Sequence, residues 1–450
     1  MRTVLKDSNY DTMLEPSDWR FSAAIVGLIE YFDYHNIKYE NDDEYILYNE
    51  SDITEERYIK FIESKYGEKL HHKLVEIKLK CDEFSSDDIK EVNDKLKANS
   101  IIKKIFSNIK FDGTNKEEIL DIINKNRFEL IKETYRTKTD MYANFANTNQ
   151  MLKEAQSWCR LVGYNIDAGK KGKSVSYNFN MNTFLAQDYI EFDFIPFAFS
   201  GDFESFFIND NFTMKRLKIS NNMLKDKLEK HDSDSKTKSS RQKFFKAIIE
   251  SSDFIKRDVE VIVKNRDKGY FETLYIRKKS IDILKAIKEN KVDYEALNIS
   301  YKVNEKYYRN IQKEVMECIL NNIFLDNLIE LYLKNKNSYI VSQLIKINIL
   351  MRGENGMKDK LKGAFACAKQ VAKSIEQNKI DSYRQKLTSS IIFKDYDRAC
   401  QILLQLSNYS NIEFGFVYDL FDDFENNKEL AYTFINALSK DDKNNDNKNN

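Results

Sequence analysis

The chain of 450 residues is long enough for two or three domains with cores of their own, and it is 42% hydrophobic and 32% charged. Since it has only two prolines and 12 glycines, it lacks the turn-forming residues that a β-sandwich or barrel of this size needs, and long helices are expected instead. Its 72 basic and 72 acidic residues cancel, but they are unevenly spread, so this balance does not exclude a polyanionic partner.

The N-terminal part is predicted to be mainly helical. Ser17 is a suitable N-cap for a helix over Asp18–Tyr34, and apolar residues cover most of the circumference of this helix, which predicts that it is buried. Glu44–Asn49 is predicted to be a strand. Apolar residues at three- and four-residue steps predict helices from Glu55 to Asn124.

The pattern changes near Tyr135. The amide-rich stretch Tyr142–Asn149 is predicted to be a loop, and residues 164–180 are predicted to form two short strands around the turn Ala168–Ser174. The dense aromatic residues of 192–212 are typical of strands packed in a core.

Beyond this segment, residues 231–240 are predicted to be a flexible connector. Alternating residues at Asp258–Val263 and Tyr270–Ile276 predict a β-hairpin with its turn at Asp267–Gly269. From Ser280 onward nearly everything is predicted to be helical, with one apolar stripe formed by Leu361, Ala364, Phe365, Ala368, Ala372 and Ile375.

The predicted fold class is therefore α+β and predominantly helical, with small sheets and hairpins in an N-terminal mixed region and a helical bundle at the C-terminus. The predicted domains are a helical or α+β domain at 1–134, a basic β-containing region with hairpins at 135–280, a helical bundle at 281–440 and a disordered tail at 441–450, which has no apolar residue.

Targeting signals are not expected. The first residues form no apolar signal core, and the longest apolar run, Phe21–Ile29, is about half the length needed to cross a bilayer. Five scattered cysteines without metal-ligand spacing are typical of reduced thiols. The sequence therefore predicts a cytoplasmic protein without a membrane partner.

The charges are segregated along the chain. Residues 40–64 hold nine acidic and two basic residues, a net charge of −7, and the last forty residues hold nine acidic residues and four lysines, a net charge of −5. Residues 215–246 hold eleven basic and four acidic residues, a net charge of +7. A solvated helix face explains such runs as well as a polyanion site does, so both interpretations stay open.

One fragment resembles a phosphate-binding loop. Gly169–Ser174 ends like that motif, but the position five residues before Gly172 is Asp167 and not glycine, and no helix is predicted to follow. A basic hairpin tip that touches a phosphate backbone is favoured over nucleotide hydrolysis.

No catalytic or metal-binding pattern is found in the sequence. His71 and His72 are adjacent, so on a helix they diverge by about 100°, and they are predicted to be surface residues rather than ligands of one ion. Without a matching histidine or lysine set, a solvated helix face is favoured over a nuclease Mg²⁺ site for Asp419, Asp422, Asp423 and Glu425. The sequence contains no nucleophile elbow. We therefore expect no catalytic centre, no metal and no cofactor.

Basic residues interleaved with aromatic residues are the remaining candidate site. Residues 264–279 hold six bases and two acids around Tyr270, Phe271 and Tyr275, a pattern that suits a phosphate backbone and unpaired bases. A solvated strand edge protected by lysines explains it nearly as well. The candidate nucleic-acid-binding residues are Lys170, Lys171, Lys173, Lys264, Arg266, Lys268, Arg277, Lys278 and Lys279.

Several blocks of sequence form one further pattern: Pro16–Leu28 followed by Tyr45–Tyr48, Ile195–Gly201 with Phe206–Asn211, Glu272–Lys278 and Glu429–Ala437. Together they resemble the large subunit of type I CRISPR Cascade complexes, in the Csx/Cst-like branch of the eighth Cas family (subtype I-B/I-A, clostridial type). These blocks are spread over almost the whole chain, and none of them is a catalytic motif.

The resemblance implies a non-catalytic subunit of a crRNA-guided surveillance complex in antiviral defence. Such a subunit lies beside the 5′ handle of the crRNA, recognises the protospacer-adjacent motif in target DNA, stabilises the R-loop and docks the helicase-nuclease, while guide pairing reads the sequence. The implied partners are crRNA, target double-stranded DNA, the backbone, handle-binding and small Cascade subunits, and the helicase-nuclease.

Two further expectations come from the same resemblance. Several relatives carry a paired CxxC zinc element, but Cys159 has no partner three residues on, so no zinc is expected. In relatives the C-terminal bundle resembles the small subunit and can be made separately from an internal start, for which Met316, Met351 and Met357 are the possible positions.

For motif recognition, the amide-rich loop is the first candidate. Asn144, Asn147 and Asn149 can donate and accept hydrogen bonds at base edges, although turn formation explains each of them at least as well. Two other functions also stay open: an independent metal-dependent nuclease of a defence system, and a purely structural helical protein-interaction subunit.

Overall fold

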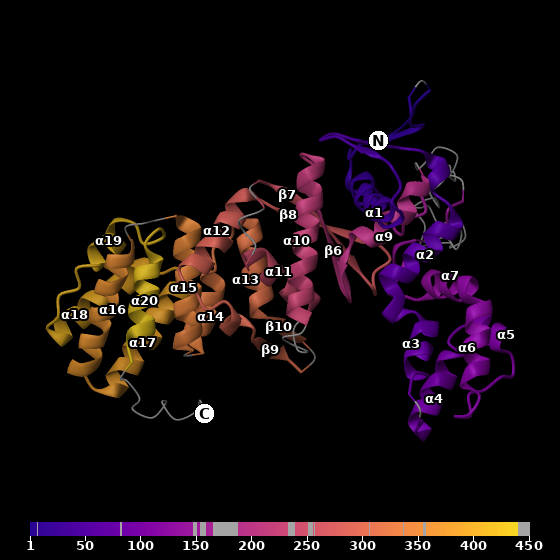
Figure 1. The fold of residues 1–450 in the computed structure, drawn as a ribbon. Coiled ribbons are helices and arrows are strands. Elements are labelled where there is room, and N and C mark those ends of the chain that lie inside the picture. Colours follow the sequence, from indigo (N-terminus) through magenta and orange to yellow (C-terminus); the bar gives the residue numbers. More distant parts are fainter. Residues whose placement is uncertain are drawn as a thin grey trace, which may run out of the picture. The chain divides into compact units, whose positions relative to one another are not determined.

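The computed structural model describes residues 1–6, 8–81, 83–146, 151–153, 159–164, 188–232, 239–250, 255, 257–305, 307–335, 337–353 and 357–439. The chain divides into two compact units: unit 1 comprises Met1–Ala247 and Asp258–Tyr275, and unit 2 comprises Ile248–Arg257 and Ile276–Asn450. Helices dominate both units and small antiparallel sheets accompany them (Figure 1), so the predicted α+β, predominantly helical class is confirmed.

The predicted domain boundaries define finer regions than these two units. Tyr58 and Phe194 lie on either side of residue 134 and share one core. Whether 1–134 and 135–280 fold as separate domains stays a prediction. The predicted tail at 441–450 lies outside the described residues.

The strands of unit 1 form two four-stranded sheets, in the orders β1-β2-β4-β3 and β5-β6-β7-β8. Their bounds are β1 Arg2–Val4, β2 Thr12–Leu14, β3 Glu40–Asn41, β4 Ile46–Tyr48, β5 Ser200–Gly201, β6 Glu204–Asn209, β7 Val259–Asn265 and β8 Phe271–Ile276, whose last residue belongs to unit 2.

The described helices of unit 1 include five short segments, η1, η2, α8, η5 and α9. Their bounds are α1 Trp19–His35, η1 Glu50–Asp52, α2 Glu55–Tyr66, η2 Gly67–Lys69, α3 His71–Lys78, α4 Ser86–Lys95, α5 Ser100–Phe106, α6 Lys116–Lys125, α7 Arg127–Thr137, α8 Tyr142–Phe145, η5 Ile190–Phe194, α9 Ile195–Ala198, α10 Met214–Asp232 and α11 Ser240–Glu250, which ends in unit 2.

Helix α1 lies at the centre of the unit 1 core, as its apolar circumference predicts. Its N-cap is Asp18 and not the predicted Ser17, because the Asp18 carboxylate accepts a hydrogen bond from the Arg20 backbone N at 2.8 Å. In the middle of α1, a Cβ on Gly27 would lie only 2.1 Å from the Phe194 backbone oxygen. This close approach requires glycine and places η5 directly against α1.

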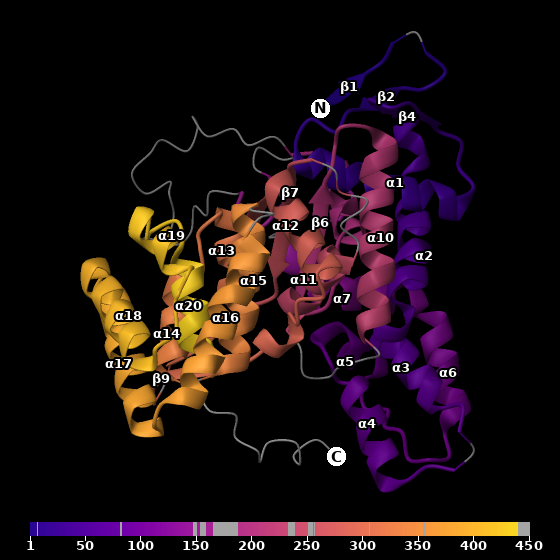
Figure 2. The same cartoon turned by 90° about the vertical axis from the view of Figure 1, so that its left-hand side faces the viewer.

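The predicted β-hairpin is confirmed as β7 and β8, and β7 pairs antiparallel with β6. Helix α10 is fixed to β6 by a buried amide: Asn221 accepts from the Ile208 backbone N and donates to the Ile208 backbone O, both at 2.9 Å. Within unit 1, α10 packs against β5 and β6 and also contacts α1 (Figure 2). This arrangement brings the basic helix α10 beside the sheet that carries the hairpin.

A buried ion network lies in the same core. The Arg160 guanidinium contacts Asp188 at 3.0 Å and Asp193 at 2.6 Å, and all three side chains are almost completely buried. Asp193 also accepts hydrogen bonds from the Tyr142 hydroxyl at 2.6 Å and from the Leu152 backbone N at 2.5 Å. The network therefore ties α8 to the segment that leads into η5.

Helices α3 to α7 form a second, smaller core in unit 1, around residues such as Val92, Phe106 and Ile123. The prediction of helices between Glu55 and Asn124 is confirmed by α2 to α6. The stretch is divided into five helices. Capping residues mark where new helices begin: the side chains of Ser85 and Asn99 accept hydrogen bonds from the first turns of α4 and α5.

Unit 2 is a helical bundle with one small hairpin. Helices α15, α16 and α20 lie side by side (Figures 1 and 2). A buried ion pair joins Arg352 on α15 to Glu429 on α20 at 2.8 Å. The bounds are α12 Lys278–Glu289, η6 Glu295–Leu297, β9 Ser300–Asn304, β10 Tyr307–Asn310, α13 Ile311–Asn321, α14 Asp326–Lys334, α15 Ser338–Arg352, α16 Met357–Ser374, α17 Gln377–Ile392, α18 Tyr396–Ser410, α19 Val417–Asp422 and α20 Lys428–Ala437.

Several local predictions are wrong. Ile190–Ala198 forms η5 and α9 instead of strands, because its aromatic rings pack around α1 with helical backbone geometry, although β6 confirms the strand predicted after it. The predicted loop at Tyr142 contains the short helix α8. The predicted helical stretch after Ser280 is interrupted by the β9–β10 hairpin, and Phe365, expected in an apolar stripe, is 51% exposed.

Candidate nucleic-acid interface

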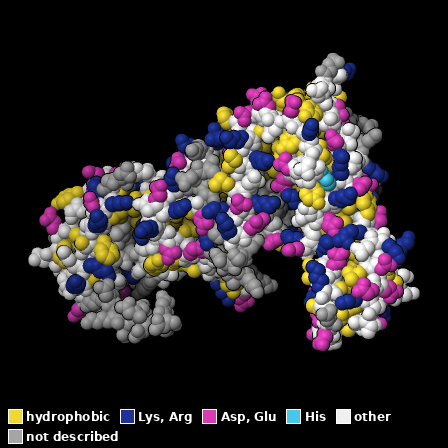
Figure 3. All heavy atoms as spheres, viewed as in Figure 1, with side chains coloured by type: hydrophobic (Ala, Val, Ile, Leu, Met, Phe, Trp, Pro, Cys, Tyr) yellow, Lys and Arg dark blue, Asp and Glu magenta, His cyan; other side chains and the backbone are white. Residues whose placement is uncertain are grey.

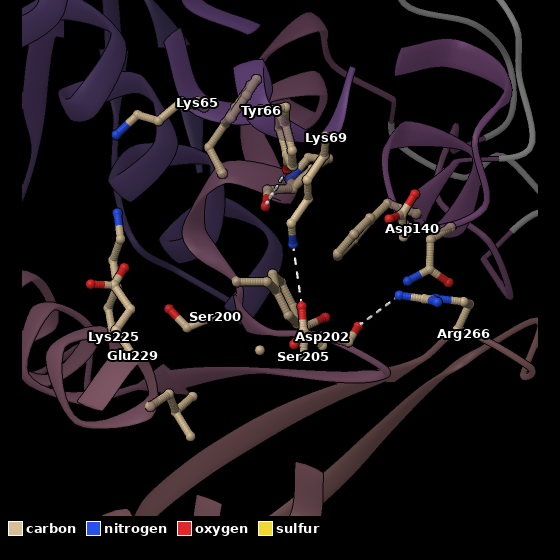
Figure 4. A pocket seen from close by; sticks show the side chains of 17 residues that line it. Lys65, Tyr66, Lys69, Asp140, Ser200, Asp202, Ser205, Lys225, Glu229 and Arg266 are labelled. Atoms are coloured by element: carbon tan, nitrogen blue, oxygen red, sulfur yellow. Dashed lines mark hydrogen bonds and ion pairs between the residues drawn. The ribbon is translucent and has the colours of Figure 1, made fainter. Parts of the chain in front are cut away.

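A pocket of about 230 Å³ lies within unit 1 between α2, α9, α10 and the β7–β8 turn. Its rim carries four basic side chains from three parts of the chain, Lys65, Lys69, Lys225 and Arg266, together with three acidic ones, Asp140, Asp202 and Glu229 (Figure 4). Residues of η2, β5 and α10 line this pocket together with the aromatic segment Pro196–Phe199.

The basic side chains of the rim are held by weak, exposed interactions. Lys69 forms an ion pair with Asp202 at 3.2 Å, and Arg266 donates to the Asp202 backbone O at 3.4 Å. Figure 4 shows the ends of Lys65 and Lys225 pointing toward one another. An exposed ion pair contributes about 0.2–1 kcal/mol, so Lys69 can exchange a carboxylate for a phosphate at low cost.

The wall below this rim is aromatic. Tyr66, Phe145, Phe197 and Phe199 line the pocket, and the rings of Tyr66 and Phe197 lie 5.9 Å apart at 49°. Phe197 itself stacks on Tyr135 in the core. A cationic rim above aromatic rings offers contacts to both the phosphate and the base of an unpaired nucleotide.

Lys264, one of the candidate phosphate-binding residues, lies inside unit 1. Its side chain is almost fully buried, and its ammonium donates to Asn144 Oδ1 at 2.9 Å, to the Asn265 O at 2.8 Å and to the Lys268 O at 2.6 Å. An ammonium has three hydrogens, so none is left for a phosphate. Burial lowers the pKa of Lys264 to about 8, and the group stays mostly protonated at neutral pH.

The turn of the hairpin carries the exposed candidates. Lys268 forms an ion pair with Glu272 at 3.1 Å, which raises its pKa, and its Nζ lies 5.5 Å from the centre of the Tyr270 ring. Tyr270 is 51% exposed. Gly163 has a φ of +78° and lies under Tyr270, where an added Cβ would approach the Tyr270 Cα to 3.1 Å. This packing fixes the hairpin turn against unit 1.

The other predicted binding residues are distributed as follows. Phe271 is partly buried against the core, whereas Tyr275 is exposed. Arg277, Lys278 and Lys279 are exposed at the start of α12 and belong to unit 2, so the sequence cluster around the hairpin is divided between two units. Lys170, Lys171, Lys173, Asn147 and Asn149 lie outside the described residues.

Sequence reasoning missed Lys65, Lys69 and the aromatic wall. Lys225 falls in the basic run of residues 215–246, so charge counting included it without assigning it to a pocket. Lys69 follows the acidic stretch 40–64 and carries no local signal. The proximity of Lys69 to Arg266 depends on tertiary contacts that span nearly two hundred residues.

Three of the four candidate acidic residues near the C-terminus have a partner, and the fourth, Asp422, is exposed. Asp419 pairs with Lys360 at 2.7 Å, Glu425 with Lys428 at 2.6 Å, and Asp423 accepts from the Asn426 backbone N at 3.1 Å. Over the ranges that the structure describes, no three His, Cys, Asp or Glu side chains gather as metal ligands would.

His71 and His72 are predicted to be surface residues, and this prediction is wrong for His72. His72 is 3% exposed and lies 3.5 Å from Glu63, and desolvation lowers its pKa. Desolvation also lowers the pKa of His71 to about 4. The His72 ring faces α2, which carries Glu63.

The visible surface in Figure 3 shows basic and acidic side chains interspersed, without a large area of one sign. Among the described residues, no helix combines the length and the apolar character that a membrane span requires.

The fold and the site together describe a predominantly helical α+β protein. Its basic hairpin adjoins a pocket with a cationic rim and an aromatic wall. The chain belongs to the family described as CRISPR-associated protein Csx8, because residues 10–438 match the model of that family. No curated protein and no solved structure matches the chain.

Proposed function

We propose that this CRISPR-associated protein is the non-catalytic large subunit of a crRNA-guided type I surveillance complex, of subtype I-B or I-A. In this role it recognises the protospacer-adjacent motif in target DNA, stabilises the R-loop and docks the helicase-nuclease. Its partners are crRNA, target double-stranded DNA and the other Cascade subunits. It acts in the cytoplasm.

The observation that carries this proposal is the cation-rimmed, aromatic pocket beside the exposed turn of the hairpin. Lys69, Arg266 and Lys268 offer charge to a phosphate backbone, and Tyr270 offers an exposed ring. Guide pairing supplies sequence specificity in RNA-guided complexes, so a subunit of this kind needs phosphate contacts and few base contacts.

Assembly is tested by co-expressing the tagged full-length chain with the neighbouring CRISPR genes and a repeat array. The chain should co-purify with crRNA and the backbone subunits, and omitting it should abolish motif-dependent binding of target DNA. A chain that binds no nucleic acid even with its partners present would support the structural alternative. Mg²⁺-dependent DNA cleavage by the isolated chain would support the nuclease alternative.

The contribution of the basic residues is tested on the assembled complex. Lys69→Gln, Arg266→Gln and Lys268→Gln should each weaken DNA binding uniformly across sequences, and the slope of log K against log salt should shrink by about 0.7–0.9 for each phosphate that the variant no longer neutralises. Lys125→Gln is the matched control, since Lys125 is exposed on α6 and pairs with Asp121. Unchanged slopes in all three variants would show that these residues only solvate the surface.

The internal start is a separate part of the proposal. A C-terminal tag on the wild-type gene should reveal a shorter product beginning at Met316, Met351 or Met357. If only the full-length band appears, the idea is wrong.

A further inference from the structure

Asn144, in the wall of the pocket, is held in one orientation by Lys264. Its Oδ1 accepts from the Lys264 ammonium at 2.9 Å, and an ammonium can only donate. If the amide were flipped, its NH₂ group would face three other hydrogens. The buried lysine therefore fixes which end of the amide remains for a ligand.

That end is a hydrogen-bond donor. The Asn144 Nδ2 makes no hydrogen bond within the part of the chain that the structure describes. Asparagine usually recognises adenine with both ends of its amide, one donating and one accepting. Since Oδ1 is engaged by Lys264, Asn144 presents only donors. The adenine ring nitrogens N1 and N7 can accept from Nδ2, but the N6 amino group beside them then faces no acceptor, so a carbonyl oxygen of a base is the better partner.

Two other polar atoms of the pocket wall are also unsatisfied. Asp140 Oδ1 and Arg266 Nε are buried and have no hydrogen-bond partner among the described residues. Such atoms also occur elsewhere in both units, and these two are shielded from solvent, so a ligand in the pocket would meet Asn144 and not these two atoms.

The size of the pocket limits what this ligand is. Small-molecule sites usually enclose roughly 300–1,000 Å³, whereas this pocket holds about 230 Å³. Asn144 is only 9% exposed, so it cannot reach the base edges of an intact duplex groove. The space suits one nucleotide that has left its stack, and the aromatic wall suits the face of its base.

We propose that the pocket receives one unstacked nucleotide of a single strand. Its base carbonyl accepts a hydrogen bond from Asn144 Nδ2, and its phosphate lies against Lys69 and Arg266. Asn144 then determines base preference and Lys264 is its positioning residue. This inference rests on the proposed nucleic-acid-binding function and assigns it a specific pocket.

The test uses the purified full-length chain and fluorescein-labelled homopolymers of thymidine, deoxyadenosine, uridine and adenosine, with binding followed by anisotropy. Carbonyl-bearing thymidine or uridine strands should bind about 2- to 10-fold more tightly than the adenine strands, the range expected for one hydrogen bond. Tighter binding of uridine strands identifies guide RNA as the source of the nucleotide, and tighter binding of thymidine strands identifies target DNA.

Asn144→Asp replaces the donor by a carboxylate that still pairs with Lys264, so it should preserve the fold and abolish the preference for carbonyl bases. Lys264→Met releases the amide and should bring the thymidine-to-deoxyadenosine affinity ratio toward one, with a smaller effect on overall binding. If Lys264→Met does not fold, Asn144→Ala takes its place, and its thymidine-to-deoxyadenosine affinity ratio should also approach one. Asn108→Asp, an exposed change away from the pocket, is the control.

Equal affinity of the wild-type chain for all four strands overturns the inference, as does an unchanged ratio in Asn144→Asp. If Lys268→Gln, which lies outside the pocket, still weakens DNA binding of the complex in that case, the proposed function survives without this pocket. If no crRNA co-purifies with the chain, the proposed function itself fails.

Discussion

Replacing Arg160 by methionine should destabilise unit 1 more than any change of an exposed charge. Arg160 is 2% exposed, and its guanidinium lies 2.6 Å from Asp193 and 3.0 Å from Asp188, which are both fully buried. Methionine fills much of the same space but removes the cation that Asp188 and Asp193 share.

The magnitude follows from the cost of an uncompensated buried charge. Breaking a buried ion pair by removing one partner costs about 3–5 kcal/mol, out of a total stability of roughly 5–15 kcal/mol. At an m-value of about 3 kcal/mol per molar urea, the unfolding midpoint should fall by roughly 1–1.7 M. The loss should be smaller when Asp188→Asn and Asp193→Asn accompany Arg160→Met, because no buried charge then remains unpaired.

Urea unfolding followed by tryptophan fluorescence is the assay, since both tryptophans, Trp19 and Trp158, fall in the residue range of unit 1. Arg57→Met is the control, because the pair of Arg57 with Asp52 is exposed and should contribute less than about 1 kcal/mol.

The deficit of the variant should also depend on pH. Burial raises the pKa of Asp193, and Arg160 opposes this rise. Without Arg160 the folded-state pKa rises further above its unfolded value, so the charged carboxylate penalises folding as pH increases through the folded pKa. The variant should therefore lose more stability at pH 8 than at pH 5. A midpoint equal to that of the wild type at both pH values would refute the reasoning.

Three further predictions concern other buried contacts. Gly27→Ala places a Cβ 2.1 Å from the Phe194 O, so η5 must move off α1, and the tryptophan-detected midpoint should fall by an amount equivalent to at least about 1–3 kcal/mol. Arg352→Met leaves Glu429 buried without its cation and should destabilise unit 2 by about 3 kcal/mol, measured by far-UV circular dichroism, with the tryptophan transition unchanged. The third concerns Lys264, whose folded pKa of about 8 lies below its usual 10.5, so the unfolded chain binds more protons between these values and the wild type gains stability as pH rises. Relative to Lys264→Met, this gain should reach up to about 2 kcal/mol between pH 7 and pH 9.5, and equal pH slopes would contradict it.

The sequence predicted the elements whose signal is local. The circumference of α1 and the alternation of β7 and β8 depend on residues a few positions apart, and these predictions are confirmed. The segment Ile190–Ala198 misled the same reasoning. Aromatic density signals burial but not backbone geometry, and here the rings pack around α1 from short helical turns.

The candidate site was predictable only in part. Charge and aromatic content pointed to the hairpin, where Arg266 lines the pocket and Lys268 pairs with Glu272, and their binding to nucleic acid stays a prediction. Lys264 shows the limit of this approach, because alternation along β7 places it on the inner face, where a polar residue was not expected. Asn144 lies 120 residues earlier in the chain, and no local pattern indicates that the two side chains meet.

The meeting of these two side chains connects the fold to the proposed function. The three hydrogen bonds of Lys264 join α8 to the turn of the hairpin, so the same ammonium that orients Asn144 also fixes the backbone from which Arg266 and Lys268 project. A change at Lys264 should therefore alter base preference through Asn144 and alter phosphate contacts through the turn. The variants of Lys69, Arg266 and Lys268 isolate the effect on phosphate contacts. The Asn144 variants isolate the effect on base preference, so the two contributions of Lys264 can be measured separately.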